Sequence, residues 1–347
     1  MGDVIAFVAS SACVNVKNFI GQENVEVLSV IVPSYNEEGN VEKTAAVVGQ
    51  LMEENSIDYE IVFVNDGSRD RTWELISAMA KRDRHIAAVN FSRNFGKESA
   101  IFAGLEVAKG DCCVLMDCDL QFPPQVIIEM YRIWEKGGVD VVEGRKKSRG
   151  KENPVYKLFS LWFYKLINNS SGLDMQDSSD FKLLDRAVVD ALNRMPERLT
   201  FFRAMSSWVG FNTEKVYFDV ADREIGESKW SGKALVKFAV NNITSFTSAP
   251  LQIVTACGVI TFVISIILGI NTLYNKFWGG AGAGFSTVII LQLLTSSIVM
   301  FSLGVIGYYI SKIYEEIKQR PRYIIRDIVR QENTDDKTQD QGESDGK

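Results

Sequence analysis

The stretch VLMDCDLQFPPQ, Val114 to Gln125, says most about how this chain folds. A short apolar run ends in Asp117 and Asp119, which one residue separates, and Gln121 follows two positions later. Such a run, bounded by polar residues and prolines, is typical of a buried strand. Two carboxylates this close repel each other unless a positive charge lies between them. The stretch therefore predicts a buried strand that ends in a site which either opens into water or holds a cation.

Composition narrows the kind of protein and the kind of cation. The chain has 347 residues, 46% of them hydrophobic, which is enough for one large domain or two. Its net charge of −6 argues against a nucleic-acid-binding protein. The five cysteines form no CxxC or zinc-like spacing, which favours a reduced compartment. Because His85 is the only histidine, a metal site would use oxygen ligands, which suit Mg²⁺ or Mn²⁺.

Apolar strands alternate with amphipathic helices from Val27 onward, and this alternation predicts an α/β fold with a mostly parallel sheet. We expect strands at residues 27–32, 60–64, 86–91, 112–116 and 139–144, and helices at 41–54, from 72, up to 107 and from 124. Ligands bind such sheets beyond the carboxyl ends of the strands. Polar residues follow all five strands there: Asn36, Glu37, Asp66, Arg93, Lys97, Asp117, Asp119, Gln121, Arg145 and Arg149. The order of the elements thus predicts one pocket built from five loops.

The last third of the chain predicts a membrane hairpin. No charged residue lies between Lys237 and Lys276 or between Lys276 and Lys312, and each interval is long enough to hold a spanning helix of about 20 apolar residues. The alternative is a pair of buried helices in a soluble core. Basic residues flank the pair on the outside, so the positive-inside rule places both termini and the preceding domain in the cytoplasm of a multi-pass protein of the cell membrane.

The chain divides into seven predicted segments. They are an N-terminal extension (1–26) without a signal peptide, an α/β domain (27–231), an amphipathic interfacial helix (232–246), two transmembrane helices (247–274 and 286–311), a basic juxtamembrane segment (312–330) and a disordered tail (331–347). Residues 232–246 alternatively form only the lead-in to the first span.

Four motifs together resemble a known family. VIVPSYNEEGNV, VNDGSRDRT, DCDLQFPPQ and REIGESKWS, in this order and followed by a membrane hairpin, resemble the family 2 inverting glycosyltransferases of GT-A fold. Within them, the chain is similar to the bacterial polyprenyl-phosphate glycosyltransferases, which are related to dolichol-phosphate mannose synthase. The resemblance covers about Val27 to Tyr314. No GxGxxG follows the first strand and no P-loop occurs.

The resemblance implies roles for matched residues on the donor side. Pro33, Tyr35, Asn36, Glu37, Asp66, Asp117 and Lys229 would bind the nucleotide sugar. Asp119 and Gln121 would hold Mg²⁺ or Mn²⁺ on the diphosphate, which explains why close carboxylates are tolerable. Asp177 and Asp180 sit where the family places acidic residues near the donor sugar.

On the acceptor side, the resemblance implies that Arg145, Arg149 and Ser228 would meet the acceptor phosphate, with Lys151 as an alternative to Arg149. Arg223 would close over the phosphates, so Asp119, Arg145 and Arg223 form the expected catalytic set.

Several of these residues also have plain structural readings. Asp66, Asp70 and Arg71 could cap helices, because aspartate is common at helix starts. Arg93 and Lys97 could be solvated. His85 is expected at the surface rather than in the site.

The expected activity is the transfer of a sugar, with inversion, from a nucleoside-diphosphate sugar to a polyprenyl phosphate. A UDP-sugar and undecaprenyl phosphate are favoured, for cell-envelope glycosylation. The alternatives are a mannose synthase using GDP-mannose, a processive polysaccharide synthase and a non-catalytic membrane subunit. The sequence leaves the sugar open, and a homo-oligomer is neither predicted nor excluded.

Overall fold

The computed structural model describes residues 26–146, 179–197, 201–218, 249–278 and 285–331. In these residues a sheet has eight strands in the order β7-β5-β6-β4-β1-β2-β3-β8. The strands are β1 (Val27–Ser34), β2 (Asp58–Asn65), β3 (Ile86–Phe91), β4 (Cys112–Leu115), β5 (Val141–Lys146), β6 (Lys182–Asp185), β7 (Thr213–Phe218) and β8 (Ile325–Arg330). The expected alternation of strands and helices is therefore present, and β6, β7 and β8 are additions to it.

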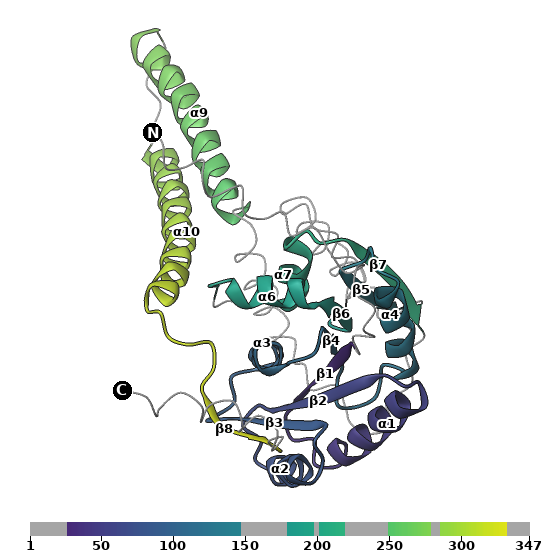
Figure 1. Cartoon of the computed structure of the whole chain (residues 1–347). Coiled ribbons are helices and arrows are strands. Elements are labelled where there is room, and N and C mark those ends of the chain that lie inside the picture. The colour runs from purple at the N-terminus through teal and green to yellow at the C-terminus, as the bar shows by residue number, and fades with distance from the viewer. Residues whose placement is uncertain (1–25, 147–178, 198–200, 219–248, 279–284, 332–347) are drawn as a thin grey trace, which may run out of the picture.

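The helices lie on both faces of the sheet (Figure 1). They are α1 (Val41–Glu54), α2 (Thr72–Arg82), α3 (Lys97–Val107), α4 (Gln125–Glu135), α6 (Arg186–Arg194) and α7 (Phe202–Trp208). Helices α1, α2 and α4 cover one face, and α3, α6 and α7 cover the other. The result is the three-layer α/β arrangement that the sequence predicts.

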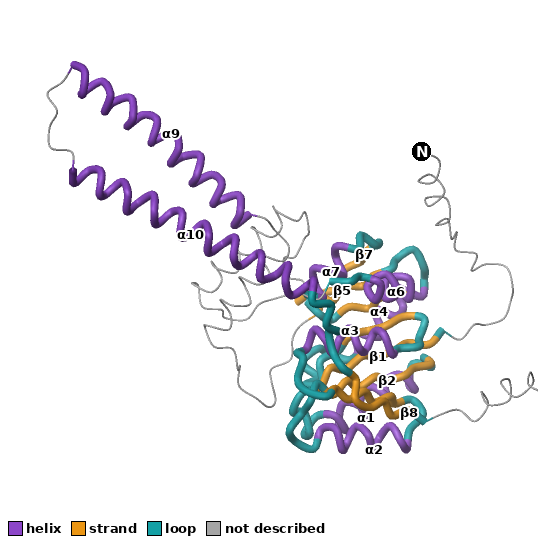
Figure 2. The backbone as a smooth tube through the Cα atoms, turned by 90° about the vertical axis from the view of Figure 1, so that its left-hand side faces the viewer, coloured by secondary structure: helices purple, strands orange, loops and turns teal. Residues whose placement is uncertain are grey.

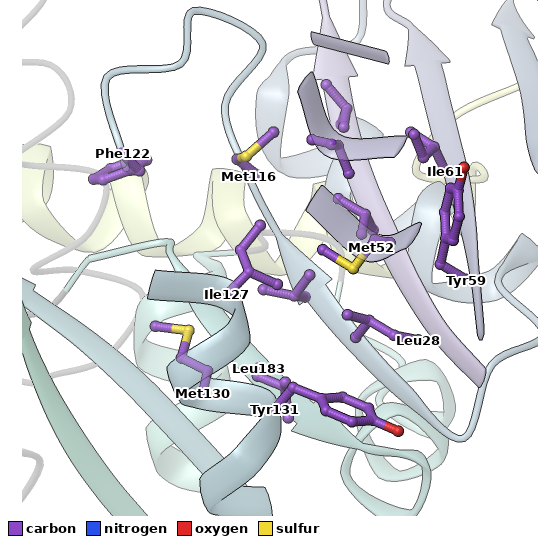
Figure 3. Close-up of a cluster of buried hydrophobic side chains, with 14 of the residues drawn as sticks. Leu28, Met52, Tyr59, Ile61, Met116, Phe122, Ile127, Met130, Tyr131 and Leu183 are labelled. Carbon is purple, nitrogen blue, oxygen red and sulfur yellow. The ribbon is translucent and has the colours of Figure 1, made fainter. Parts of the chain in front are cut away.

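Two hydrophobic clusters fill the spaces between the layers. Figure 3 shows part of the first, which contains Met52 of α1, Ile127 and Met130 of α4 and Leu28 of β1. The second lies under α3, which is buried along most of its length. A Cβ on Gly104 would come within 2.3 Å of the Ile31 side chain, so α3 lies directly on β1 and only glycine fits there. Dense packing on both faces fixes the strand ends that carry the polar loops.

Strand direction decides which residues share an edge of the sheet. Strands β1 to β5 and β7 are parallel, whereas β6 and β8 run antiparallel to their neighbours. An antiparallel strand begins at the edge where parallel strands end. Ile325, at the start of β8, accordingly pairs with Phe91, at the end of β3. The residues before β6 and β8 therefore join the loops after β1 to β5 at one edge.

Two long helices, α9 (Ala249–Trp278) and α10 (Phe285–Ile317), form a pair that extends away from the sheet domain (Figure 2). Both contain windows apolar enough to cross a membrane, Val254–Asn271 and Leu294–Ile317, and neither window is buried in the protein. Phe262 and Met300 are about two-thirds exposed, at 67% and 70%. Exposed apolar surface of this extent is typical of a membrane-facing or partner-facing surface and disfavours the alternative of two buried core helices.

The segment after α10 differs from its prediction. Residues 312–330 are expected as a basic juxtamembrane segment, but α10 continues to Ile317 and residues 325–330 form strand β8 beside β3. The three middle residues of IRDIVR are exposed and two of them are charged, which suits an edge strand but gives no apolar strand pattern in the sequence.

Candidate active site

The loops after β1 and β2 are fastened to each other. The Asn36 N–H donates to Ser68 Oγ at 2.9 Å, and Asn36 Oδ1 accepts from the Arg69 N–H at 2.9 Å. Asn36 has a φ of 55°, a conformation that asparagine tolerates better than most residues. The expected nucleotide-framing residue thus occupies a turn that two reciprocal bonds define.

The same two loops meet again one residue further along. The Glu37 N–H donates to Thr72 Oγ1 at 2.9 Å, and the Glu38 N–H donates to Asp70 Oδ2 at 3.2 Å. Asp70 Oδ1 also accepts from the Thr72 N–H at the start of α2, which is the capping role expected for Asp70. Partial burial alone would raise the pKa of Asp70, but the hydrogen bonds from Thr72 and from the Glu38 backbone lower it.

Asp66 joins the loop after β2 to the loop after β3. Its two carboxylate oxygens accept the backbone N–H groups of Phe95 at 2.6 Å and Gly96 at 2.9 Å, and the residue is 3% exposed. Burial raises the pKa of Asp66, and the two backbone hydrogen bonds and Arg93 offset part of that rise. Gly67 follows with a φ of 64°, and a Cβ there would lie 2.4 Å from the Arg93 backbone. Asp66 therefore shapes the loop, while its contact with a nucleotide base remains a prediction.

The opening motif forms a strained turn at the end of β4. Leu120 has a φ of 54°, which costs a non-glycine residue roughly 1–2 kcal/mol. The Gln121 N–H donates to Asp119 Oδ1 at 3.2 Å, which closes the turn. Asp117 and Asp119 are both partly exposed, whereas Cys118 between them is buried. Strain of this kind collects at functional sites, and here it lies directly after two carboxylates that are both partly exposed.

The donor set at this turn fits a hard divalent cation. Asp117, Asp119 and Gln121 offer only oxygen ligands and lie within five residues of each other. In the part of the chain that the structure describes, no three His, Cys, Asp or Glu side chains converge as a metal cluster. Mg²⁺ is commonly held by one or two carboxylates together with substrate phosphates, which is the arrangement that this turn could support.

Lys97, at the start of α3, links two acidic residues, one just after β4 and the other just before β6. Its Nζ lies 2.6 Å from Asp117 Oδ1 and 3.1 Å from Asp180 Oδ2. Arg203 of α7 binds Asp180 from the other side, with Nε 2.6 Å from Oδ1 and the terminal nitrogen 3.1 Å from Oδ2. Asp180 thus receives two cations, and Asp117 shares one of them.

These ion pairs lower the pKa of Asp180 and raise the pKa of Lys97. Burial alone would raise the pKa of Asp180, but Lys97 and Arg203 hold it well below its usual range. Burial alone would lower the pKa of Lys97, but Asp117 and Asp180 raise it above its usual value. Burial and the negative charge of Asp180 raise the pKa of neighbouring Glu98 to about 7, although the Phe202 N–H donates to it at 2.8 Å. Glu98 is therefore the group in this cluster that titrates near neutral pH.

Arg145 continues the charged cluster at the end of β5. Its side chain is 9% exposed, and its Nε donates to Glu143 Oε2 at 3.0 Å. The other oxygen of Glu143 lies 3.2 Å from Lys182 Nζ, which also donates to Ser206 at 3.1 Å. Burial lowers the pKa of Lys182 despite Glu143. The expected acceptor-phosphate arginine thus lies in a buried ion chain, and its role remains a prediction.

Between the end of β1 and the segments that carry Asp117 and Asp180 lies a cleft too narrow to hold a water molecule. Pro33, Lys97, Asp117, Phe122 and Asp180 are among the residues that line it. Tyr35, which directly follows β1, is 42% exposed. The structure therefore brings together the described members of the expected donor site from the loops after β1, β2 and β4.

Some expected residues lie outside the described part of the chain: Arg149, Lys151, Asp177, Arg223, Ser228 and Lys229. Their roles stay predictions. His85 lies at the opposite edge of the sheet, stacked on Tyr59 at 4.7 Å and 3.0 Å from Asp83, as expected for a residue outside the site.

Sequence reasoning missed Glu98 and Arg203 and left Lys97 undecided. Lys97 and Asp180 are 83 residues apart, so only the fold joins them. The available signal was the pair of acidic residues in DSSDFKLLDR, whose charge calls for cations nearby.

A mostly parallel α/β sheet with an aspartate pair at its carboxyl edge is the GT-A-like architecture expected above. The family model for glycosyl transferase family 2 matches residues 29–192. The chain is 38% identical over 300 residues to the uncharacterized glycosyltransferase YkcC of Bacillus subtilis, covering 86% of this chain and 93% of that protein. The chain belongs to glycosyl transferase family 2.

Other relatives have more specific names. The bactoprenol glucosyl transferase of Shigella phage SfII is 36% identical over 301 residues, covering 86% of this chain and 97% of its own length. A prophage bactoprenol glucosyl transferase homolog of Escherichia coli is 37% identical over 303 residues, covering 87% and 99%. Among solved structures, glucosyl-3-phosphoglycerate synthase from Mycobacterium tuberculosis with Mn²⁺ and UDP-glucose matches with a TM-score of 0.45 at 17% identity, covering 64% of this chain and 79% of that chain.

Proposed function

We propose that this protein transfers a sugar from a nucleoside-diphosphate sugar to a polyprenyl phosphate at the cytoplasmic face of the cell membrane. The donor is a UDP-sugar and the acceptor undecaprenyl phosphate, and the lipid-linked sugar then serves cell-envelope glycosylation. The observation that carries the proposal is the turn Asp117–Gln121, here called the aspartate turn. It lies at the same edge of the sheet at which the chain returns from α10. Relatives that match nearly end to end are named for glucosyl transfer to bactoprenol, which supports the lipid acceptor.

The position of the hairpin supports a lipid acceptor independently of names. Helices α9 and α10 are long, apolar and exposed, as membrane-spanning helices are. The chain leaves α10 and enters β8 at the same sheet edge that carries Asp117 and Asp180. A site at this edge lies near the level of lipid headgroups, where the phosphate of a polyprenyl lipid is presented.

The reaction is a single displacement at the anomeric carbon. The bond from that carbon to the diphosphate oxygen breaks, a bond to an acceptor phosphate oxygen forms, and the nucleoside diphosphate leaves, so the configuration inverts. The acceptor needs little activation by a base, because a phosphate monoester has a second pKa near 6. The main tasks of the protein are therefore to hold two anions together and to stabilise the leaving group.

The side chains divide these tasks. Asp119 and Gln121, with Asp117 beside them, would hold a divalent cation, which would neutralise charge on the leaving diphosphate. Tyr35 and Asn36 frame the nucleotide, and Asp66 keeps its loop closed. Asp180 faces the sugar, ionised between Lys97 and Arg203. Arg145, Arg149, Arg223, Ser228 and Lys229 supply positive charge and hydrogen bonds to phosphates.

Lipid-product formation tests the proposal. Purified protein with Mn²⁺ and undecaprenyl phosphate is incubated, in separate tubes, with labelled UDP-glucose, UDP-N-acetylglucosamine and GDP-mannose. We expect organic-phase label from one UDP-sugar. Label from GDP-mannose alone would favour the mannose synthase alternative, and a water-soluble polymer would favour the processive synthase. Nucleotide binding without transfer from any donor would favour the non-catalytic subunit.

A further inference from the structure

The segment Pro321–Arg330, here called the return segment, follows the second long helix and packs onto the sheet domain. Its strand β8 pairs with β3 from Phe91–Ile325 to Ala87–Arg330. Arg330 also binds Glu60 of β2 at 2.5 Å, which fastens its far end. The chain therefore re-joins the catalytic sheet after leaving the membrane, and its other contacts lead toward the donor site.

A line of hydrogen bonds crosses from β8 to the loops after β1 and β2, here called the nucleotide loops, which carry Asn36 and Ser68. Asn90 Nδ2 donates to Asp327 Oδ2 at 3.0 Å, and Asn65 Nδ2 donates to Asn90 Oδ1 at 2.8 Å. Asn65 Oδ1 accepts from the Ser68 N–H at 3.3 Å, and Ser68 Oγ accepts from the Asn36 N–H at 2.9 Å. Asn65 and Asn90 are buried, at 2% and 7% exposed. Each amide uses its oxygen toward the nucleotide loops and its nitrogen toward β8, so Asp327 is the terminal acceptor of the line.

A second path runs through aromatic rings. Tyr323 stacks on Phe91 with ring centres 5.2 Å apart, and Phe91 meets Phe95 edge-on at 5.7 Å. The Phe95 N–H is one of the two donors to Asp66. The Tyr323 hydroxyl also bonds to Glu106 of α3. The ring of Tyr323 thus supports the loop whose backbone holds Asp66.

A third contact reaches the helix that begins with Lys97. The Arg322 guanidinium lies 4.8 Å from the Phe102 ring centre and bonds to the Met195 carbonyl oxygen, and Ser99 Oγ lies 3.5 Å from the Arg322 carbonyl oxygen. Three independent contacts from one short segment therefore end at the supports of Asn36, Asp66 and Lys97.

From these contacts we propose that Asp327 and Tyr323 are positioning residues for the nucleotide half of the donor site, acting through Asn90–Asn65 and through Phe91–Phe95. The proposal rests on the proposed function, because it assigns these residues to the site that binds the nucleoside diphosphate. Neither residue touches the donor. Each fixes a loop that does, so that the segment leaving the membrane sets the affinity of the catalytic domain for its donor.

Variants at residue 327 separate positioning from bulk stability. Asp327→Leu removes the terminal acceptor, and Asp327→Asn keeps an oxygen that can accept from Asn90. Ile328→Thr changes the adjacent, 53% exposed residue of the same strand and is the matched control. Nucleotide affinity is measured on the full-length protein in detergent with UDP and Mn²⁺ by calorimetry, and the melting temperature is measured in parallel.

We expect Asp327→Leu to weaken UDP binding about fivefold, in the range of couplings carried through packed networks. Asp327→Asn and Ile328→Thr should bind as the unchanged protein does. Tyr323→Leu, which breaks the aromatic path, should weaken binding by a similar factor and serves as a second test if Asp327→Leu does not fold.

Two results would overturn the inference. If Asp327→Leu and Tyr323→Leu lower the melting temperature but leave UDP affinity unchanged, the return segment is only structural while the proposed function stands. If the unchanged protein itself does not bind UDP or GDP, the proposed function fails together with this extension of it.

Discussion

The two sides of the cleft are held together by different forces. On the side of β1, β2 and β3, loops are joined mainly by hydrogen bonds to backbone groups, such as those from Phe95 and Gly96 to Asp66. On the side of β4, β6 and α7, the joints are ion pairs, and Asp180 is held between Lys97 and Arg203. The first side is therefore fixed in shape before any ligand binds, whereas the charges of the second can be shared with an incoming anion or cation.

This difference fits the division of labour in the proposed reaction. A nucleoside is largely neutral and is recognised by shape and hydrogen bonds, which a rigid loop frame provides. Diphosphate, metal and acceptor phosphate are charged, and charged side chains make the strongest hydrogen bonds to such groups. The ion pair of Lys97 with Asp117 places an ammonium group at the aspartate turn, where the charged parts of the substrates are expected to bind.

The largest expected effect is on the charged side. Asp119→Ala should lower the rate of transfer at least about 10²-fold, because it removes a ligand that helps neutralise the leaving group. The rate is measured as organic-phase label with a saturating labelled donor.

Asp190→Ala, at an exposed position on α6, is the matched control and should transfer normally. A fully active Asp119→Ala protein in the presence of a chelator would contradict the metal mechanism.

Asp66→Asn removes a hydrogen-bond acceptor from the loops on the side of β1, β2 and β3. One backbone N–H of Phe95 or Gly96 would then face an amide NH₂ instead of an oxygen, and a buried donor without an acceptor costs about 1–3 kcal/mol. We expect the free energy of unfolding in detergent to fall by that amount and nucleotide affinity to weaken.

Asp58→Asn, at an exposed position at the start of β2, controls for the loss of a negative charge. Unchanged stability and unchanged nucleotide affinity in Asp66→Asn would show that the backbone bonds to this carboxylate do not shape the loop.

Arg203→Met tests the charged side by stability. Asp180 would keep only Lys97, and because Arg203 is 32% exposed the expected loss is about 1–2 kcal/mol, less than for a fully buried pair. The two sides should also differ in their response to salt. At 1 M salt, where the screening length is about 3 Å, the loss of unfolding free energy in Arg203→Met should shrink. The loss in Asp66→Asn should stay the same.

Arg194→Met, an exposed arginine of α6, is the control for charge removal. Equal salt dependence of Arg203→Met and Asp66→Asn would break the comparison between the two sides.

The smallest effect concerns pH. The pKa of Glu98 in the folded protein is raised from 4.5 to about 7, so between these values the folded state holds a proton that the unfolded state has lost. The contribution of Glu98 to stability therefore falls as pH rises from about 4.5 to 7. Glu98→Gln removes this term and keeps an acceptor for the Phe202 N–H.

The measurement is the unfolding free energy at pH 5, 6, 7 and 8. Relative to the unchanged protein, Glu98→Gln should gain about 1 kcal/mol or more between pH 5 and pH 8. A constant difference across the series would show that Glu98 does not carry the predicted proton.

Local pattern explains what the sequence predicted well. The helix expected at residues 41–54 is α1, and the strand expected at 86–91 is β3, because a clear period and nearby turn residues mark both. Strand β6 has only four residues, and β8 is rich in charge, so neither stands out from its surroundings. Sequence alone placed the aspartate turn correctly after a buried strand.

The sequence does not predict which residues far apart in the chain contact each other. Asp180 is recognisable as acidic, but its binding to Lys97 and Arg203 depends on an antiparallel β6 and on α7 packing beside α3. In the same way, no local signal links Asp327 to Asn90, which lies 237 residues earlier. Such contacts follow from strand order, and strand order is set by the whole chain.

The most direct test of the central claim is the identity and stoichiometry of the released nucleotide. Purified protein, Mn²⁺, undecaprenyl phosphate and the donor that labels lipid are incubated together, and the nucleotide and lipid products are both quantified. Transfer of a glycosyl group to a lipid phosphate predicts one nucleoside diphosphate per lipid-linked sugar, and none without the lipid. Release of nucleoside monophosphate, or of nucleoside diphosphate with no lipid product, would contradict it.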